Sequence, residues 1–394
     1  MSWWEVFRDE MKTIYTNSAL LLTVFGGVVM YSFLYPLPYS QQLPREQSIV
    51  VVNLDNTSTS RQLERMVNAT PQVNITQHAY SLDAAKYLFD QGDVHGILVI
   101  PSHFSRDLLL GKSPTLAYAG DAAYFLVYGT VVEGLATAGG TLSTKAKVSR
   151  MVMSGENLVL ASLQYAPINL SMQPVFNPTN GYINYIVPAV FVLILHQTLL
   201  IAAGLLGGEQ NEKRKIDQSG YWRECHPFDL WSARTVILFL TYIPLVMYYF
   251  GFSFEFYGIS KLASISPLLA MIFPFLLAVI FTGMVIGELV PRREIATVIV
   301  VLSSLPLVFC AGFVWPTSEL PTVLNWLAQL VPSTPAINGF LRLNQMGTSF
   351  EQVLPYLWQL WAQVFIYGSI SLWLMARQSK FDAHHRCKSK RSAP

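Results

Sequence analysis

Charged and aromatic side chains gather in one loop of this sequence, residues 207–234. Glu209 and Lys213 are four positions apart, a spacing that forms an ion pair on one face of a helix. The loop also contains further charged and aromatic residues: Glu212, Arg214, Lys215, Tyr221, Trp222, Arg223, Phe228 and Trp231. Aromatic residues and arginines are typical of protein contacts. The loop therefore predicts a short charged helix within a docking surface, with a merely solvated loop as the alternative.

Residue sets that perform catalysis or hold metals are not found in the sequence. Gly111-Lys112-Ser113 resembles the end of a phosphate-binding loop, but Arg106 stands where that loop needs a glycine. His78, His95 and His103 match no compact zinc spacing. A glycine-flanked nucleophilic serine and a His-Glu-x-x-His helix are also missing. We therefore predict no catalytic residue, no metal site and no cofactor on this chain.

The composition places the charged loop at the edge of a membrane. Apolar residues make up 52% of the 394 residues and charged residues only 13%, whereas soluble domains carry about 25% charge. A membrane-spanning helix needs about 20 apolar residues. Six segments qualify: Ser18–Pro36, Tyr182–Leu206, Thr235–Tyr257, Ser264–Gly287, Ile295–Trp315 and Leu354–Ala376. The first exceeds the roughly 7–15-residue core of a signal peptide, so we predict a retained anchor.

Few polar side chains lie inside these spans. His196, with Gln197 beside it, is costly if it faces lipid, so it either lines a functional path or makes a hydrogen bond between helices. Glu255 lies near the outer end of its span and can pair with Lys261. Two small residues, Gly283 and Gly287, predict a close approach between helices.

Lysine and arginine residues near short loops set the orientation of the spans. One set of short segments holds Arg8, Lys12, Lys213, Arg214, Lys215, Arg223, Arg234, Arg292 and Arg293, and the tail 377–394 is also basic. The opposite set has only Lys261 and Arg342. Both termini are therefore predicted to be cytoplasmic, and residues 37–180 to be extracytoplasmic. Because the basic residues act as topological signals, we expect no nucleic-acid partner.

Residues 37–180 alternate between strand and helix patterns. Strands are expected at Ile49–Leu54, Val73–His78, Val94–Ile100 and Thr115–Ala119, and helices at Ser58–Asn68, Asp83–Gln91 and from Pro101 to Gly111. A long, broken helical stretch follows over residues 122–165. This order predicts a small α/β domain. No disulfide can stabilise this domain, because Cys225, Cys310 and Cys387 all lie elsewhere, so it depends on its own core.

Two further segments are expected at the membrane surfaces. Residues 1–17 place apolar side chains at spacings of three and four, which predicts an amphipathic interfacial helix: Trp4, Phe7, Met11 and Ile14. Residues 316–353 are apolar but interrupted by proline. They predict two half-helices, Leu320–Leu330 and Ala336–Leu343, dipping into the outer leaflet.

Three passages together resemble the permease subunits of ABC type-2 exporters, in the subgroup with a large domain after the first span. The first is Val51-Val52-Asn53-Leu54-Asp55-Asn56-Thr57 with Ser60-Arg61-Gln62-Leu63. The second is Ile100-Pro101-Ser102-His103-Phe104 with Asp107-Leu108-Leu109. The third is Gly312-Phe313-Val314-Trp315-Pro316 with Leu320-Pro321 and Leu330-Val331-Pro332. The likeness covers almost the whole chain.

The resemblance implies a half-transporter of a bacterial inner membrane, moving an amphipathic or hydrophobic small molecule outward. A separate cytoplasmic ATPase subunit would bind ATP and Mg, and a second copy or a similar permease would complete the dimer. A periplasmic adaptor protein is a further implied partner. The alternatives are a non-transporting membrane receptor or assembly scaffold, and a membrane enzyme, for which no convergent catalytic set is found.

The resemblance also implies that residues 209–217 form the main coupling helix, with the turn 290–294 as a second contact. The expected ATPase-coupling residues are Glu209, Glu212, Lys213, Arg214, Trp222, Arg223, Arg292 and Arg293. Relatives usually follow the start of this loop with Gly-Thr, whereas this chain continues Lys215-Ile216-Asp217-Gln218. The register of the contact therefore departs from the family pattern.

Overall fold

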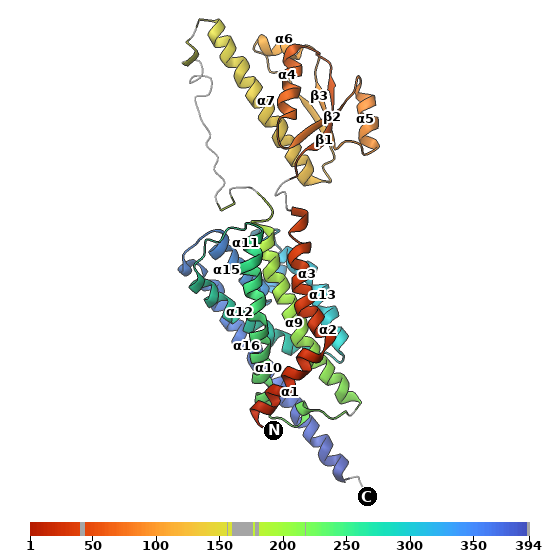
Figure 1. Ribbon diagram of the computed structural model, residues 1–394, viewed down its shortest axis with the longest axis vertical. Helices are drawn as coiled ribbons and strands as arrows, with labels where there is room; N and C mark the ends of the chain where they lie inside the picture. Colours follow the sequence, from red (N-terminus) through yellow and green to blue (C-terminus); the bar gives the residue numbers. More distant parts are fainter. Residues whose placement is uncertain (40–43, 156, 160–175, 178–180, 217, 392–394) are drawn as a thin grey trace. The chain divides into compact units, whose positions relative to one another are not determined.

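The computed structural model describes residues 1–39, 44–155, 157–159, 176–177, 181–216 and 218–391, with side chains up to Lys380. The chain divides into two compact units (Figure 1). Residues 41–173 form one unit, which we call the sheet domain. Residues 1–40 and 174–394 form the other, which we call the membrane bundle.

The sheet domain is built on four strands in the order β2-β1-β3-β4. They are β1 (Gln47–Asn53), β2 (Val73–His78), β3 (Gly96–Ile100) and β4 (Ala117–Gly120). The first three are parallel, and β4 runs antiparallel to β3. Residues Ile49 to Val52 of β1 are all fully buried. An unbroken apolar run is what a parallel strand covered on both faces requires.

Helices cover both faces of this sheet (Figure 1). They are α4 (Ser58–Asn68), α5 (Leu82–Asp90), α6 (Phe104–Leu109) and α7 (Phe125–Met153). Ile49 and Val51 pack with α4, α6 and α7, whereas Val50 and Val52 pack with Ala85 of α5. This division follows from the two-residue period of a strand.

The expected elements of the sheet domain are confirmed, with shifted ends. The helix 58–68 and the strand 73–78 occur as expected. The helix expected from Pro101 begins at Phe104, because His103 has a left-handed backbone with φ 64°. The helical stretch expected over residues 122–165 is broken, as expected: α7 is continuous to Met153, and a turn follows in which Gly155 has φ 98°. Gly134 does not interrupt α7 but lets the helix approach Val73, whose methyl lies 2.9 Å from an ideal Cβ.

The membrane bundle is helical. The first apolar segment comprises α2 (Ser18–Leu21), a π-helical turn η1 (Leu22–Gly26) and α3 (Gly27–Leu34). It is preceded by α1 (Trp3–Thr16). The long helices that follow are α9 (Ile186–Lys215), α10 (Pro227–Met247), α12 (Ile265–Leu289), α13 (Arg293–Cys310) and α16 (Phe350–Arg391). Shorter segments are η4 (Tyr248–Ser253), α11 (Phe254–Phe256), α14 (Thr322–Gln329), α15 (Ser333–Phe340) and η6 (Leu341–Gln345).

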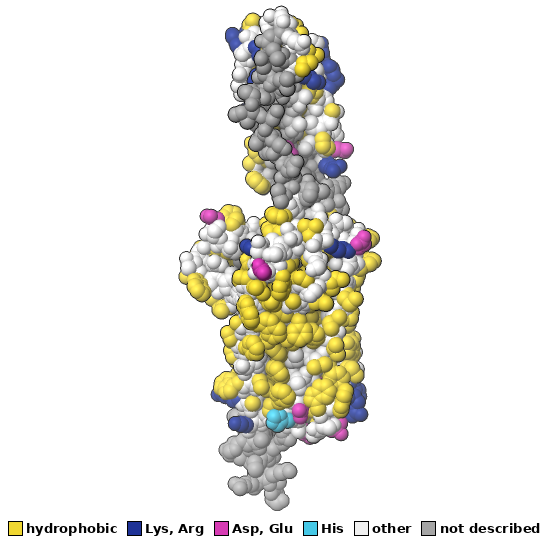
Figure 2. Space-filling model, turned by 90° about the vertical axis from the view of Figure 1, so that its left-hand side faces the viewer, with side chains coloured by type: hydrophobic (Ala, Val, Ile, Leu, Met, Phe, Trp, Pro, Cys, Tyr) yellow, Lys and Arg dark blue, Asp and Glu magenta, His cyan; other side chains and the backbone are white. Residues whose placement is uncertain are grey.

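Helix α9 forms the centre of the bundle. Nearly every residue from Val187 to Gly208 is buried, and α9 packs against α3, α10, α12, α13 and α15. A helix that is apolar on all sides must be enclosed by others. Figure 2 shows the complementary outer surface, where a broad hydrophobic band is exposed and charged side chains gather beyond it.

Six of the described helical segments are long and apolar enough to cross a membrane: Ser18–Tyr39, Phe125–Met153, Ile186–Lys215, Pro227–Phe256, Ile265–Leu289 and Arg293–Cys310. Five of them match expected spans. The sixth is α7, whose buried residues Val131, Leu135 and Leu142 belong to the core of the sheet domain. The expected span Leu354–Ala376 lies within α16, which packs against α12 and α15. The protein is thus a polytopic α-helical membrane protein with a small α/β domain.

Polar residues in α16 donate hydrogen bonds to the proline-interrupted segment 316–353. The two expected half-helices occur as α14 and α15, with η6 continuing α15 to Gln345. Gln359 and Gln363 each donate a hydrogen bond of 2.9 Å to the carbonyl of Gln329, at the end of α14. These contacts satisfy carbonyl groups that the end of a helix leaves free. The span expected to reach Trp315 was too long, because α13 ends at Cys310 and Gly312 has φ 91°.

Helices α9 and α12 approach each other through glycines, as the small residues at 283 and 287 predicted. An ideal Cβ on Gly207 would lie 2.7 Å from the carbonyl carbon of Gly287. One on Gly283 would lie 2.9 Å from the carbonyl oxygen of Leu200. Any larger side chain at these positions therefore separates the two backbones.

Gly207→Ala is expected to lower the midpoint of thermal unfolding, because overpacking of this kind costs about 1–3 kcal/mol. Gly251→Ala in η4 is the matched control, since no atom lies within 4 Å of its ideal Cβ. Unfolding of both variants is followed in detergent by size-exclusion chromatography with fluorescence detection. Equal midpoints for the two variants would contradict the close helix contact.

Candidate functional site

The candidate functional region lies at one end of the membrane bundle, where α1, the end of α9 and the end of α16 are found (Figure 1). A capping box between Ser2 and Glu5 starts α1. Its inward face presents Val6, Glu10 and Ile14, all buried. Val6 packs in a small core with residues of the loop 207–234 and of α16: Trp222, Cys225, Leu230, Ala233 and Met375. The amphipathic helix is thus held on the bundle by its apolar face.

A fully buried ion pair fixes α1 to α10. Arg234 Nε lies 2.5 Å from Glu10 Oε1, and both side chains are 0% exposed. The hydroxyl of Tyr221 donates a second hydrogen bond to Glu10. Burial and the adjacent carboxylate raise the pKa of Tyr221, so this hydroxyl stays protonated and remains a donor. This pair was not predicted from the sequence, although Glu10 recurs with Val6 and Ile14 at four-residue spacing on the apolar face.

The aromatic residues of the loop 207–234 point mostly inward. Trp222 is 8% exposed, and Lys213 Nζ lies 5.4 Å from the centre of its ring. Trp231 donates a hydrogen bond of 2.9 Å to Ser371 of α16. Phe228 alone among the four aromatics of the loop is exposed. The loop is therefore a packed layer, and the solvated loop considered as an alternative is wrong.

The expected short helix starting at Glu209 is also wrong. Helix α9 continues without a break from the apolar core through Glu209 to Lys215. Gly207 and Gly208 do not end it, because they serve close packing: an ideal Cβ on Gly208 would lie 2.8 Å from Arg293 Cα. Asp217 lies outside the described residues. The charged segment is thus the rigid end of the central helix.

Glu209 connects this end of α9 to the first membrane segment. Lys213 Nζ lies 2.6 Å from Glu209 Oε1, the expected ion pair. Asn17 Nδ2 donates to the other carboxylate oxygen at 3.0 Å. Asn17 also caps α2 by accepting a hydrogen bond from the backbone N–H of Leu20. A side-chain hydrogen bond therefore links α9 at Glu209 to the start of the first apolar segment.

A polar cluster joins α9 to α12 and α16. Asn211 Nδ2 donates to the carbonyls of Gly287, Glu288 and Val290 at 2.9–3.1 Å. Arg214 donates to Asn211 at 2.8 Å and to Gln378 of α16, and it lies 3.9 Å from the buried carboxylate of Glu288. We call Asn211, Arg214, Glu288 and Gln378 the polar lock. It fixes the last turn of α9 to the end of α12.

The expected ATPase-coupling residues thus fall into two groups. Most are occupied by contacts within the chain: Glu209, Lys213, Arg214, Trp222 and Arg223, whose guanidinium donates to the carbonyl of Arg214 at 3.2 Å. Glu212 is half-buried. Arg292 and Arg293 are exposed in the turn between α12 and α13, where Arg293 pairs with Glu294 at 3.0 Å. We call the exposed residues Lys215, Ile216, Arg292 and Arg293 the basal face.

The intramembrane polar residues do not form one site with the basal face. His196 is buried in α9, and neither ring nitrogen has a hydrogen-bond partner among the described residues. The interhelical hydrogen bond considered for it is therefore not formed, and neighbouring Gln197 is half-buried. Glu255 is exposed and pairs with Lys261 at 2.6 Å, as expected. In the described part of the chain, no group of His, Cys, Asp or Glu side chains is arranged to hold a metal.

Comparison with known families decides the class of this molecule. The model of the ABC-2 family transporter protein matches residues 18–373. The chain belongs to the ABC-2 transporter family. No curated protein matches the sequence. The matched range includes the sheet domain and three residues of the polar lock, Asn211, Arg214 and Glu288.

Membership of the ABC-2 family indicates which kind of partner this permease has. Its members are membrane components of ABC transporters, and the family implies a separate partner ATPase subunit. This ABC-2 permease subunit thus has an exposed basic turn, Arg292–Arg293, resting on the backbone of the central helix. It also has a set of internal contacts that links that helix to the start of α2, to α12 and to α16.

Glu10→Gln is expected to destabilise the permease by about 3–5 kcal/mol, because it leaves the charge of Arg234 buried without its partner. Asp9→Asn is the matched control, since Asp9 makes only a surface contact of 3.6 Å with Arg8. Replacing Glu10 and Arg234 together with methionine is expected to restore most of the loss. Thermal unfolding in detergent measures all three, and a midpoint for Glu10→Gln equal to that of the control would contradict the assignment.

Proposed function

We propose that this ABC-2 permease subunit exports an amphipathic or hydrophobic small molecule, a drug-like compound or a lipid, from the cytoplasm or inner leaflet. A separate cytoplasmic ATPase subunit, which binds ATP and Mg, supplies the energy. The observation that carries the proposal is the junction at the end of α9. There an exposed basic turn sits against a rigid helix that is hydrogen-bonded to three other helices.

The proposed topology puts this junction in the cytoplasm of a bacterial cell, with the sheet domain on the outer side of the inner membrane. The excess of lysine and arginine at this end of the bundle supports it. Helix α1, the end of α9 and the last turns of α16 lie at the same end (Figure 1). In this proposed topology both chain termini share the cytoplasmic side of the membrane.

In the proposed coupling, the ATPase contacts the basal face, and the internal contacts transmit the motion. A displacement of the Arg292–Arg293 turn acts on α9 through the backbone contact at Gly208. Asn211 passes it to α12, and Glu209 passes it through Asn17 to the first apolar segment. Arg214 and Arg223 have a transmitting role here, because each already donates a hydrogen bond within the chain.

A second copy of this chain, or a similar permease, completes the proposed transporter. The outer side of α13 supports it, because this helix exposes a run of apolar side chains: Val298, Ile299, Val301, Leu302, Leu305 and Phe309. A run of this kind suits either lipid or a second subunit. The sheet domain is the part that a periplasmic adaptor would contact.

Mild extraction from the native membrane tests the proposed class. We expect a chain with a phosphate-binding loop to co-purify, with an ATPase activity that changes when amphipathic compounds are added. Mass spectrometry identifies the chain, and phosphate release measures the activity. Recovery of this protein without any ATPase, under extraction that keeps other ABC complexes intact, would favour the alternative of a receptor or assembly scaffold.

Arg292→Glu combined with Arg293→Glu is expected to reduce compound-stimulated ATP hydrolysis by about tenfold or more, because reversed charges repel a complementary surface. Lys86→Glu in α5 is the control, an exposed charge reversal in the sheet domain. Both variants are purified with the ATPase and compared for activity and for the amount of ATPase retained. Unchanged coupling in the double variant would remove the basal face from the ATPase contact.

A further inference from the structure

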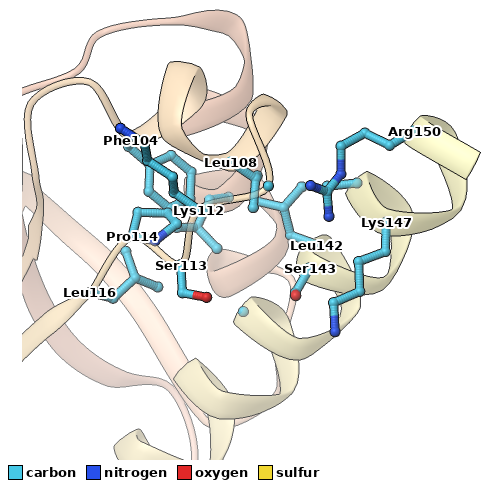
Figure 3. A pocket seen from close by; sticks show the side chains of 14 residues that line it. Phe104, Leu108, Lys112, Ser113, Pro114, Leu116, Leu142, Ser143, Lys147 and Arg150 are labelled. Carbon is cyan, nitrogen blue, oxygen red and sulfur yellow. The ribbon is translucent and has the colours of Figure 1, made fainter. Parts of the chain in front are cut away.

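The sheet domain contains a cavity that no step of the proposed transport uses. Its volume is about 280 Å³. It lies between α7 and the segment that leads from α6 to β4 (Figure 3). Gly111 ends the turn after α6 with φ 81°, and residues 112–116 then run back toward the sheet. On the opposite side, α7 contributes Gly139, which has no side chain to fill the cavity. An ideal Cβ at this position would lie 3.7 Å from Leu116 Cδ1.

The floor of the cavity is apolar. It is formed by five side chains contributed by α4, α6, α7 and the segment before β4: Leu63, Phe104, Leu108, Leu116 and Leu142. Leu63, Phe104 and Leu142 are buried and belong to the core of the domain. This surface is therefore fixed by the fold, and it offers a preformed contact for a hydrocarbon group.

One wall of the cavity is cationic. Lys147 and Arg150 extend from α7 on the same side, and the Arg150 guanidinium reaches toward the loop that carries Lys112 (Figure 3). Its Nη1 would lie 2.0 Å from an ideal Cβ on Gly111, so the guanidinium rests against that backbone. Lys112, in contrast, is already 4.0 Å from the carboxylate of Asp107.

Lys147 and Arg150 are the two cations of α7 that line the cavity. Among the described residues, no Asp or Glu side chain lies within ion-pair distance of Lys147 or Arg150. The Arg150 Nε is buried and has no hydrogen-bond partner in the described structure. A buried donor without an acceptor is costly, so an acceptor supplied by a ligand would be stabilising. Guanidinium groups bind carboxylates and phosphates through paired hydrogen bonds.

We propose that this cavity binds a small amphipathic anion, with a carboxylate or phosphate head on Arg150 and Lys147 and a single short hydrocarbon chain on the leucine floor. The hydroxyls of Ser113 and Ser143 line the same cavity and can donate to the head group. At about 280 Å³ the cavity lies just below the about 300–1,000 Å³ typical of small-molecule sites, which suits one short chain and excludes a two-chain phospholipid. This site does not depend on the proposed transport.

Binding is measured on the full-length protein in nanodiscs of zwitterionic lipid, with empty nanodiscs as the blank. Radiolabelled decanoate is expected to bind saturably, and decyl phosphate to displace it. Decanol and acetate are expected to compete at least about tenfold less well. Decanol lacks the anionic head group, and acetate lacks the hydrocarbon chain. Equal competition by decanol would show a merely hydrophobic site and would overturn the proposal.

Two variants locate the binding. Lys147→Gln combined with Arg150→Gln is expected to weaken decanoate binding by about tenfold or more. Gly139→Leu fills the cavity from α7 and is expected to abolish binding. The variant is expected to keep α7 helical, because leucine has a higher helix propensity than glycine. Lys145→Gln is the control: the same charge on the same helix, exposed and outside the cavity.

The outcomes separate the cavity from other sites. Circular dichroism and thermal unfolding first establish that each variant is folded. Wild-type affinity in both the double variant and Gly139→Leu would overturn the proposal. A loss in Lys145→Gln alone would also overturn it, because binding would then belong to the neighbouring shallow groove, which Lys145 lines.

Discussion

The close contact between α9 and α12 is the constraint on which the rest of the membrane bundle depends. Glycines at 204, 207 and 208 of α9 meet Gly283, Gly287 and the start of α13 with backbone against backbone. Only at this separation does Asn211 reach three carbonyl groups at the end of α12. The same approach brings Arg214 to the buried Glu288. Small residues thus determine which polar groups become partners.

In the region predicted for ATPase contact, some charged residues hold helices together and others are exposed. Charges on α9 are largely used to hold helices together, and a buried Glu10–Arg234 pair attaches the amphipathic helix to the same assembly. Because buried charges tolerate little displacement without their partners, these elements are expected to move as one body. The residues left outside, on the turn between α12 and α13, are then the natural points at which a partner can act on that body.

The sheet domain is stabilised by its apolar core. Helices on both faces of its mostly parallel sheet give it an apolar core on each side. The cavity beside α7 arises where the chain turns at Gly111. It combines part of that core with two cations that pair with no acidic side chain among the described residues. A basic site of this kind was not apparent in the sequence, where Gly111-Lys112-Ser113 drew attention instead and Arg150 stood among ordinary polar residues.

The sequence by itself determined the class of the molecule, because its signals are local. Runs of apolar residues identified the membrane helices, and two-residue and four-residue periods located most strands and helices of the sheet domain. Helix continuity through Glu209, the inward turn of Trp222 and the pairing of Glu10 with Arg234 were decided only by tertiary structure. These features join residues far apart in the chain. Whether a charged side chain is a contact point or an internal brace depends on which neighbours the packed backbone brings within hydrogen-bonding distance.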